Sequence, residues 1–572
     1  MFNLHEFFIG ESFCAQEYFG AHITENGCTF RTFAPSAQRV CVIGDFNAWH
    51  EDDMSQPENN GVWQIEIPAS KAGQLYKYVI YSQKGRVEHC DPYSAQMELR
   101  PNFASVIVSD ESLDFDDEKW LRARTKNYDT PLNIYELHLG SWRRKEDGTP
   151  YKYDEIGGEL IAYVKAHGFT HVELMPLSEH PVDASWGYQN TGFFAPTSRY
   201  GTKAALKKLI KQLHAANIGA ILDFVPFHFA LDSYALANYD GAALYEYDTK
   251  DVGVSEWGTH NFNFARGEVR SFMQSAAAMW LGEFHFDGLR MDAVSRAIYW
   301  LGDPARGVNP CSVAFIKTMN AGLLQRYPTA MLIAEDSTAF PKVTAPVAYD
   351  GLGFDYKWDL GFMNDTLEFM SQPPAARAAN MGRLEFSMRY FYNELYILPF
   401  SHDEVVHGKK TIIDKLYGTY EEKFAEARLL YMYMFTHPGK KLNFMGNELA
   451  MFREWDEARE CDYDLLKYPA HSEFNAYFKA LSTIYAADER LYKGEYDSRA
   501  FNRINPKCDT PLLYAFERGY EKNRVTVLLN FSDKPAKVEF PKAKIIFATS
   551  EKAATATKTT ITLAPYDGVI VE

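Results

Sequence analysis

Eight short apolar segments recur between about residues 130 and 480, and segments with helical periodicity separate most of them. Apolar strands that alternate with amphipathic helices predict parallel strands joined by crossover helices. Eight such units close into a (β/α)8 barrel, so we expect this TIM-barrel fold at the centre of the chain. The predicted strands are 134–139, 171–176, 220–225, 286–292, 331–335, 354–358, 396–400 and 441–445.

Polar residues follow four of these strands at the point where each strand ends. The carboxyl ends of the strands form the active face of such a barrel, so these side chains are expected to meet in one site. On the fourth strand an arginine and an aspartate are two residues apart, so they point to the same side, and the arginine can hold the carboxylate ionised. Taken alone, that pair is equally consistent with a structural ion pair. The strand-end residues are Asp223, His228, Arg290, Asp292, Glu335, His402 and Asp403.

Short alternating segments with turn signals lie on both sides of the predicted barrel and indicate two β-sandwiches. We expect residues 1–112 to form an N-terminal β-sandwich, 113–484 the catalytic barrel and 485–572 a C-terminal β-sandwich. The segment 551–559 is expected to be an exposed loop. The predicted N-terminal strands are 28–33, 39–44, 61–67, 74–81 and 104–108, and the C-terminal ones are 512–516, 525–530, 536–540, 544–548, 559–563 and 568–571.

Several motifs give the chain a family resemblance. The segment 40–49, with Asp91, Pro92 and Tyr93 at the exit of the module, resembles the carbohydrate-binding module that precedes branching and debranching enzymes. The remainder resembles the α-amylase superfamily, and specifically the 1,4-α-glucan branching enzymes. This resemblance covers nearly the whole chain and rests on the segments 135–142, 172–176, 186–189, 194–201 and 401–409, of which the last is the most specific.

The resemblance implies a retaining mechanism with three catalytic carboxylates. A retaining glycosidase needs a carboxylate nucleophile and a carboxylic acid, roughly 5–5.5 Å apart across the glycosidic bond. Asp292 is the candidate nucleophile, and Glu335 is the candidate acid/base. Asp403 is expected to hold the distorted sugar ring through its 2- and 3-hydroxyls.

Five further residues are expected to bind substrate or to order the site. By resemblance, His228 and His402 contact the sugar at the cleavage site, and Tyr188 stacks under the same ring. Asp223 is expected to order the site within reach of Arg290. Aromatic residues make up 15% of the chain, and Trp142, Trp186 and Trp257 are candidates for stacking on further sugar units, or for core positions.

Three functions are compatible with these residues. The favoured one is a transglycosylase that cleaves an α-1,4-glucan chain and transfers it to a 6-hydroxyl, which forms the α-1,6 branches of glycogen. The alternative is a debranching or trehalose-releasing hydrolase with the same carboxylates. A catalytically inactive glucan-binding scaffold is the third reading, and the complete Asp292, Glu335 and Asp403 set argues against it.

No metal or cofactor is expected. Many α-amylases carry a calcium-binding asparagine where this chain has Phe227, and a phenyl ring cannot ligate calcium. The acidic residues of the following insert are expected to be solvated, and no glycine-rich phosphate-binding motif is present. These acidic residues are Asp232, Asp240, Glu246 and Asp248.

Charge and composition limit the possible partners. The net charge of −17 argues against nucleic acid and anionic membranes as partners and leaves an α-1,4-glucan, namely glycogen, amylose or amylopectin. Seven scattered cysteines predict neither a disulfide framework nor a metal site. The first residues lack the pattern of a signal peptide, and no run of ~18 apolar residues is present. We therefore expect a cytoplasmic protein, taken as a monomer with an oligomer left open.

Overall fold

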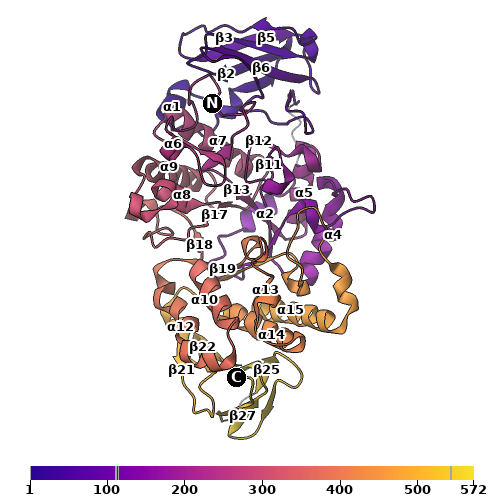
Figure 1. Ribbon diagram of the computed structural model, residues 1–572, viewed down its shortest axis with the longest axis vertical. Helices are drawn as coiled ribbons and strands as arrows, with labels where there is room; N and C mark the ends of the chain where they lie inside the picture. Colours follow the sequence, from indigo (N-terminus) through magenta and orange to yellow (C-terminus); the bar gives the residue numbers. More distant parts are fainter. Residues whose placement is uncertain (1, 110–112, 114, 542–543) are drawn as a thin grey trace.

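The computed structural model describes residues 2–109, 113, 115–541 and 544–572. The chain forms an elongated molecule in which the barrel lies between two β-rich ends (Figure 1). The N-terminal sheets lie at one end of the long axis, and the C-terminal sheets lie at the other end. Within the described residues, we find no helix with the length and apolar character needed to cross a membrane.

The centre of the chain is the predicted closed barrel of eight parallel strands, in the order β9-β10-β13-β16-β17-β18-β19-β20. Every residue of these strands is buried, which explains their near-continuous apolar sequences. Helices such as α5 (Lys203–Ala215), α7 (Gly267–Gly282), α14 (Tyr420–Thr436) and α15 (Pro469–Ala487) follow or separate the strands. The strands are β9 (Asn133–Leu137), β10 (His171–Leu174), β13 (Gly219–Phe224), β16 (Gly288–Met291), β17 (Met331–Ala334), β18 (Tyr356–Trp358), β19 (Tyr396–Phe400) and β20 (Lys440–Phe444).

The N-terminal module consists of two antiparallel sheets, and all five predicted strands are present. Three strands that the sequence analysis did not predict complete the sheets, namely β1 (Gly20–Ile23), β4 (Asp52–Asp53) and β7 (Gly85–His89). Buried Tyr93 joins the module to the barrel, since its ring centroid lies 5.1 Å from that of Phe194 and 5.2 Å from that of Phe272. The first expected domain boundary involves residue 112, which lies outside the described residues. The predicted strands correspond to β2 (Gly27–Phe33), β3 (Arg39–Gly44), β5 (Val62–Pro68), β6 (Leu75–Ser82) and β8 (Ser105–Val106).

The C-terminal part contains a five-stranded and a three-stranded antiparallel sheet. The exposed loop predicted for 551–559 is wrong in part: most of these residues are exposed, but β26 (Ala554–Ala556) pairs with β27 (Thr560–Leu563) and Ala553 before it is fully buried. Short alanine and threonine runs carry too little apolar contrast to predict such an edge strand. The second expected domain boundary, between 484 and 485, falls inside α15. The domain division therefore stays a proposal, with this boundary moved beyond Ala487.

Candidate active site

The two central carboxylates are held by the backbone at neighbouring strand ends. Asp292 directly follows β16, and Glu335 directly follows β17, which is the next strand in the barrel. The Asp292 amide donates to the carbonyl of Phe224 at 2.9 Å, and the Glu335 amide donates to that of Met291 at 3.1 Å. Ala293 adopts the left-handed conformation (φ 50°), which is uncommon for a residue other than glycine, and its amide donates to Glu335 Oε2 at 2.6 Å. This strained turn links the two carboxylates.

The Arg290 guanidinium connects three carboxylates at the centre of the site. Its Nη1 donates to Asp223 Oδ1 at 2.7 Å and to Asp292 Oδ1 at 2.9 Å. Its Nη2 lies 3.4 Å from Glu335 Oε2, and its Cζ lies 4.4 Å from the ring centroid of Trp358. Arg290 is almost fully buried, so its charge acts on these groups with little screening by water. The predicted contacts of Arg290 with Asp292 and Asp223 are confirmed.

The environment gives the two carboxyl groups opposite protonation states. Burial raises the pKa of Asp292, but a hydrogen bond from His228 Nε2 at 3.3 Å and the Arg290 charge outweigh it and hold the pKa below its ordinary value. Burial raises the pKa of Glu335 to about 7; Arg290 opposes this shift, and the negative charges of Asp292 and Asp403 add to it. Below about pH 7, Asp292 is therefore ionised while most of its neighbour Glu335 retains a proton.

A second group of residues lies around His402, which follows β19. Its Nδ1 donates to Glu136 Oε1 at 2.5 Å, and its Nε2 lies 3.2 Å from the Tyr188 hydroxyl and 3.5 Å from Asp403 Oδ1. Burial lowers the pKa of His402, but the Asp403 and Glu136 carboxylates raise it to about 9, so the imidazole is cationic. Tyr188 stacks on His402 and donates to Asp223 Oδ2 at 2.5 Å, which joins this group to the Arg290 cluster.

The structure thus brings all eight predicted site residues together at the carboxyl ends of the strands. Asp403 differs from the other carboxylates because half of its side chain is exposed, so it lies on the solvent side of the site. Sequence reasoning missed two residues of the barrel interior, Glu136 and Glu173, which are paired in register on β9 and β10. Both are fully buried, and burial together with the Glu136 and Asp223 charges raises the pKa of Glu173 far above its ordinary value. An acidic residue within an otherwise apolar strand was the signal for both.

Three family models match successive parts of the chain. Residues 18–94 match carbohydrate-binding module 48 (isoamylase N-terminal domain), and residues 158–251 match the alpha amylase catalytic domain. Residues 513–570 match the alpha-amylase SusG C-terminal domain. These three matches follow one another in the same order as the N-terminal sheets, the barrel and the C-terminal sheets.

Curated relatives decide the family. The chain is 44% identical to 1,4-alpha-glucan branching enzyme GlgB of Fusobacterium nucleatum over 530 residues, covering 92% of this chain and 86% of the relative. It is 41% identical to the protein of the same name from Bacillus subtilis over 542 residues, covering 93% of this chain and 86% of the relative. The chain belongs to the 1,4-α-glucan branching enzyme family.

Solved structures confirm the fold of this branching enzyme family member at much lower identity. A putative alpha amylase from Salmonella typhimurium has a TM-score of 0.75 at 17% identity, covering 97% of this chain and 99% of that one. A pullulanase from Anoxybacillus, complexed with maltotetraose, also has a TM-score of 0.75 at 17% identity, covering 97% and 87%. At such identity these likenesses concern the fold alone.

Two of the four aromatic candidates lie open beside the carboxylates. Trp142 is fully buried, so of its two predicted alternatives the core position holds. Trp257 is 48% exposed, and its ring centroid lies 5.4 Å from that of His228, which contacts Asp292. Trp186 is partly exposed, and its ring lies 5.8 Å from His402. Aromatic faces therefore lie near both histidines, alongside Tyr188.

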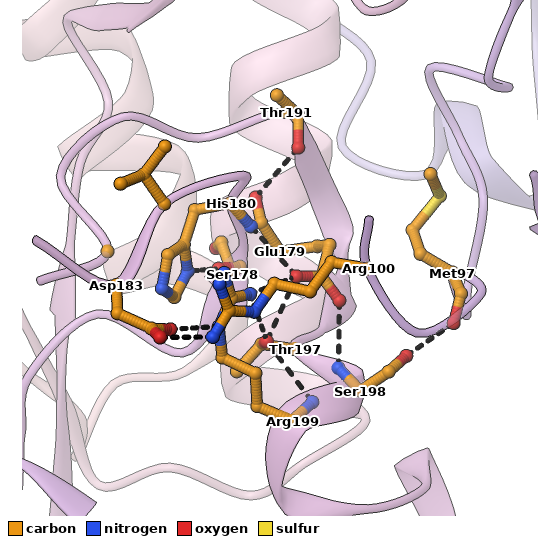
Figure 2. Close-up of polar contacts among 12 residues, drawn as sticks. Met97, Arg100, Ser178, Glu179, His180, Asp183, Thr191, Thr197, Ser198 and Arg199 are labelled. Atoms are coloured by element: carbon orange, nitrogen blue, oxygen red, sulfur yellow. Dashed lines mark hydrogen bonds and ion pairs between the residues drawn. The ribbon is translucent and has the colours of Figure 1, made fainter. Parts of the chain in front are cut away.

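A polar network surrounds the buried ion pair of Arg199 with Glu179 (Figure 2), and it includes Asp183, which precedes Trp186 and Tyr188 in the chain. The Arg199 guanidinium donates from Nη1 to Glu179 Oε1 at 2.6 Å and from Nε to Asp183 Oδ1 at 2.7 Å. Arg100, from the segment that leaves the N-terminal module, also pairs with Asp183. The Ser198 hydroxyl donates to the Met97 carbonyl. The network thus ties the N-terminal module to a loop of the active face.

Removing Arg199 should destabilise this part of the molecule strongly. Arg199→Met leaves the buried Glu179 carboxylate without its cation, and such a loss costs about 3–5 kcal/mol. Arg100→Met is the matched control, because Arg100 pairs with the same Asp183 but its side chain is 40% exposed, and it should cost less than about 1 kcal/mol. Thermal unfolding monitored by circular dichroism measures both variants. Equal melting temperatures for the two variants would contradict the importance of the buried pair.

The position that binds calcium in many α-amylases is apolar in this branching enzyme family member. Phe227 is buried, and its ring lies 6.2 Å from that of Phe264. Asp240 and Glu246 were predicted to be solvated, but they are buried and accept hydrogen bonds from the amides of Ser36 and Asn238 at 2.7 Å each. Each of these buried carboxyl groups therefore has a backbone amide as a partner.

Metal independence stays a prediction. Among the described residues, no group of three or more histidine, cysteine or acidic side chains has the arrangement of a metal site. Dialysis against a strong chelator should leave both activity and melting temperature unchanged. A melting temperature that falls and is restored by added calcium would contradict this prediction.

Proposed function

We propose that the protein is a glucan transglycosylase that cleaves an α-1,4-glucan chain by retaining double displacement and transfers it to a 6-hydroxyl, forming an α-1,6 branch. The observation that carries the chemistry is the placement of Asp292 and Glu335 around a single arginine, at 2.9 and 3.4 Å, in surroundings that shift their pKa values in opposite directions. The family of the curated relatives supports transfer as the outcome.

In the first half-reaction, the Glu335 carboxyl donates its proton to the glycosidic oxygen, and the bond from this oxygen to the anomeric carbon breaks. The Asp292 carboxylate attacks the same carbon and forms a glycosyl ester, while the remainder of the chain leaves with a free 4-hydroxyl. Arg290 and His228 keep Asp292 ionised and oriented for this attack. Asp403 binds the ring hydroxyls. Cationic His402 stabilises the negative charges of the Asp403 and Glu136 carboxylates beside it.

In the second half-reaction, Glu335 is a carboxylate and acts as the base. It removes the proton of an acceptor 6-hydroxyl, whose oxygen attacks the anomeric carbon and releases Asp292. Water at the same position gives hydrolysis, so the carboxylates alone do not select the product. Transfer requires an acceptor chain held at a high effective concentration, and Tyr188, Trp186 and Trp257 offer aromatic faces for the two chains.

Linear amylose tests this proposal. Iodine staining should fall as long chains are cut and rejoined as short branches, while new reducing ends stay near zero over the same period. Reducing ends that rise in step with the loss of colour would identify a hydrolase. No change in either signal with a folded protein would favour an inactive scaffold. A cytoplasmic location and a monomeric state stay predictions.

A further inference from the structure

A buried glutamate of the barrel interior, Glu136, begins a chain of hydrogen bonds that ends at the proposed nucleophile. Its Oε1 accepts a hydrogen bond from His402 Nδ1 at 2.5 Å, and its Oε2 accepts one from the His402 amide at 3.2 Å. Glu136 lies on β9, whereas His402 begins the turn that follows β19, and both side chains are buried. Glu136 therefore fixes both the ring and the backbone of a residue of the site.

The chain continues from the other nitrogen of the imidazole. His402 Nε2 lies 3.2 Å from the Tyr188 hydroxyl, which in turn lies 2.5 Å from Asp223 Oδ2. Asp223 Oδ1 accepts from Arg290 Nη1 at 2.7 Å, and the same Nη1 donates to Asp292 Oδ1 at 2.9 Å. Unbroken polar contacts therefore connect the imidazole to the carboxylate that attacks the sugar.

One proton of this chain can lie in either of two places. In the first arrangement, His402 is an imidazolium that donates to the Tyr188 oxygen, and Tyr188 donates to an ionised Asp223. In the second arrangement, both hydrogen bonds point the other way, so the imidazole is neutral and Asp223 holds the proton. The two arrangements contain the same number of protons. Burial raises the pKa of Asp223 to about 7 against the Arg290 charge, so this carboxyl group can hold the proton near neutral pH.

Glu136 favours the imidazolium. A carboxylate 2.5 Å from Nδ1 forms a charge-assisted hydrogen bond, which is stronger with a cationic ring than with a neutral one. Both groups are buried, so water screens their attraction little. Burial lowers the pKa of His402, but the Asp403 and Glu136 carboxylates raise it to about 9. The other charged or titratable groups around this ring are Arg290, Tyr188, Asp223, Glu173 and His138.

We propose that Glu136 is a positioning residue that keeps this proton on His402 and thereby keeps Asp223 ionised. An ionised Asp223 holds the Arg290 guanidinium in place, and the guanidinium orients the carboxylate of Asp292. Glu136 acts only through these other residues. The role rests on the proposed function, since it serves the same reaction at the same site.

Glu173 provides a matched control on the neighbouring strand β10. It is paired in register with Glu136 and is equally buried. Neither oxygen of its carboxyl group has a hydrogen-bond partner in the described part of the chain. A buried carboxylate without a partner is costly, so Glu173 carries a proton. Glutamine therefore replaces a neutral group by a neutral group of similar shape in Glu173→Gln, but removes a negative charge in Glu136→Gln.

The protonation of His402 is the first measurement. Ring signals of isotope-labelled histidine are followed by NMR over a pH titration, and the signal that is missing from a His402→Gln protein identifies this residue. In the wild type the ring should stay protonated until the pH reaches about 9. In Glu136→Gln it should lose its proton at a lower pH, whereas Glu173→Gln should titrate as the wild type does.

Turnover of amylose, followed by the loss of iodine colour, is the second measurement. In Glu136→Gln, kcat should fall about 10- to 100-fold with KM little changed, because the nucleophile is oriented less well. Glu136→Asp keeps the negative charge, so it should recover part of kcat and part of the His402 titration. Glu173→Gln should keep kcat close to that of the wild type. A role in stability alone would lower the melting temperature and leave both measurements unchanged in the folded protein.

The outcomes separate this role from the proposed function. A His402 titration that is unchanged in Glu136→Gln would overturn the inference, as would equal losses of kcat in the two glutamine variants. If Glu136→Gln does not fold, Glu136→Asp decides, because only a lower titration together with a lower kcat supports the role. If the wild type forms no branches, the proposed function fails, and the titration still tests where the proton lies. If branches form and the titration is unchanged, the inference fails and the proposed function stands.

Discussion

Replacing Asp292 with glycine should reduce turnover of amylose by at least about a thousandfold, because the first half-reaction loses the group that bonds to the anomeric carbon. The protein should stay folded and still bind glucan, since the side chain is a partner of Arg290 and not part of the apolar core. Initial rates and a melting curve, measured on the same preparation, check both statements.

Restoring the activity of the Asp292→Gly protein with a small anion distinguishes a nucleophile from a residue that only positions other groups. Azide can enter the space left by the carboxylate and attack the anomeric carbon, which would restore part of the cleavage and form a glycosyl azide. Asp350→Asn is the matched control, since that carboxylate is largely exposed and pairs with Lys317 on the surface. An Asp292→Gly protein that keeps more than about a tenth of the wild-type rate would refute the nucleophile assignment.

Glu335→Gln should lower kcat/KM about 100- to 10,000-fold, because an amide cannot donate the proton that the leaving oxygen requires. The pH dependence provides the sharper test. The acid form of Glu335 is the active one and its pKa is raised to about 7, so wild-type kcat/KM should fall as the pH rises through about 7. At acidic pH, kcat/KM should fall as Asp292 becomes protonated. Because the pKa of Asp292 is lowered, this fall should lie below the ordinary carboxyl range.

The residual activity of the glutamine variant should no longer depend on pH near 7, because the titrating group is absent. A purely structural role for Glu335 predicts instead a lower rate in the variant, with the same fall in kcat/KM as the pH rises through about 7. If kcat/KM of the variant still falls as the pH rises through about 7, the proton transfer belongs to another group.

Sequence patterns predicted the barrel because its determinants are local. Each strand is a short apolar run between helical periods, and parallel strands of a closed barrel place their polar ends on one face. Arg290 and Asp292 were predicted to contact each other because they are two residues apart on a strand, and the structure confirms this at 2.9 Å. The contact of Arg290 with Asp223 was likewise expected and is present.

Features that depend on long-range packing could not be read from local patterns. Glu136 contacts His402 across 266 positions of sequence, and together with Asp403 it raises the pKa of the imidazole. Trp142 lies in the core because Tyr135, Tyr163 and Tyr463 surround it, although its motif alone permitted an open position. Asp240 and Glu246 are buried and each accepts a hydrogen bond from a backbone amide of another segment, and composition alone carries no sign of that.

Proton NMR of amylose treated with the wild-type protein is the most direct test of transfer. Each transfer exchanges one α-1,4 linkage for one α-1,6 linkage and releases no additional reducing end. We predict that α-1,6 anomeric signals grow by the amount that the α-1,4 signals lose, while the signals of reducing ends stay constant. Reducing-end signals that grow by the full loss of α-1,4 linkages, with no α-1,6 signal, would contradict branch formation.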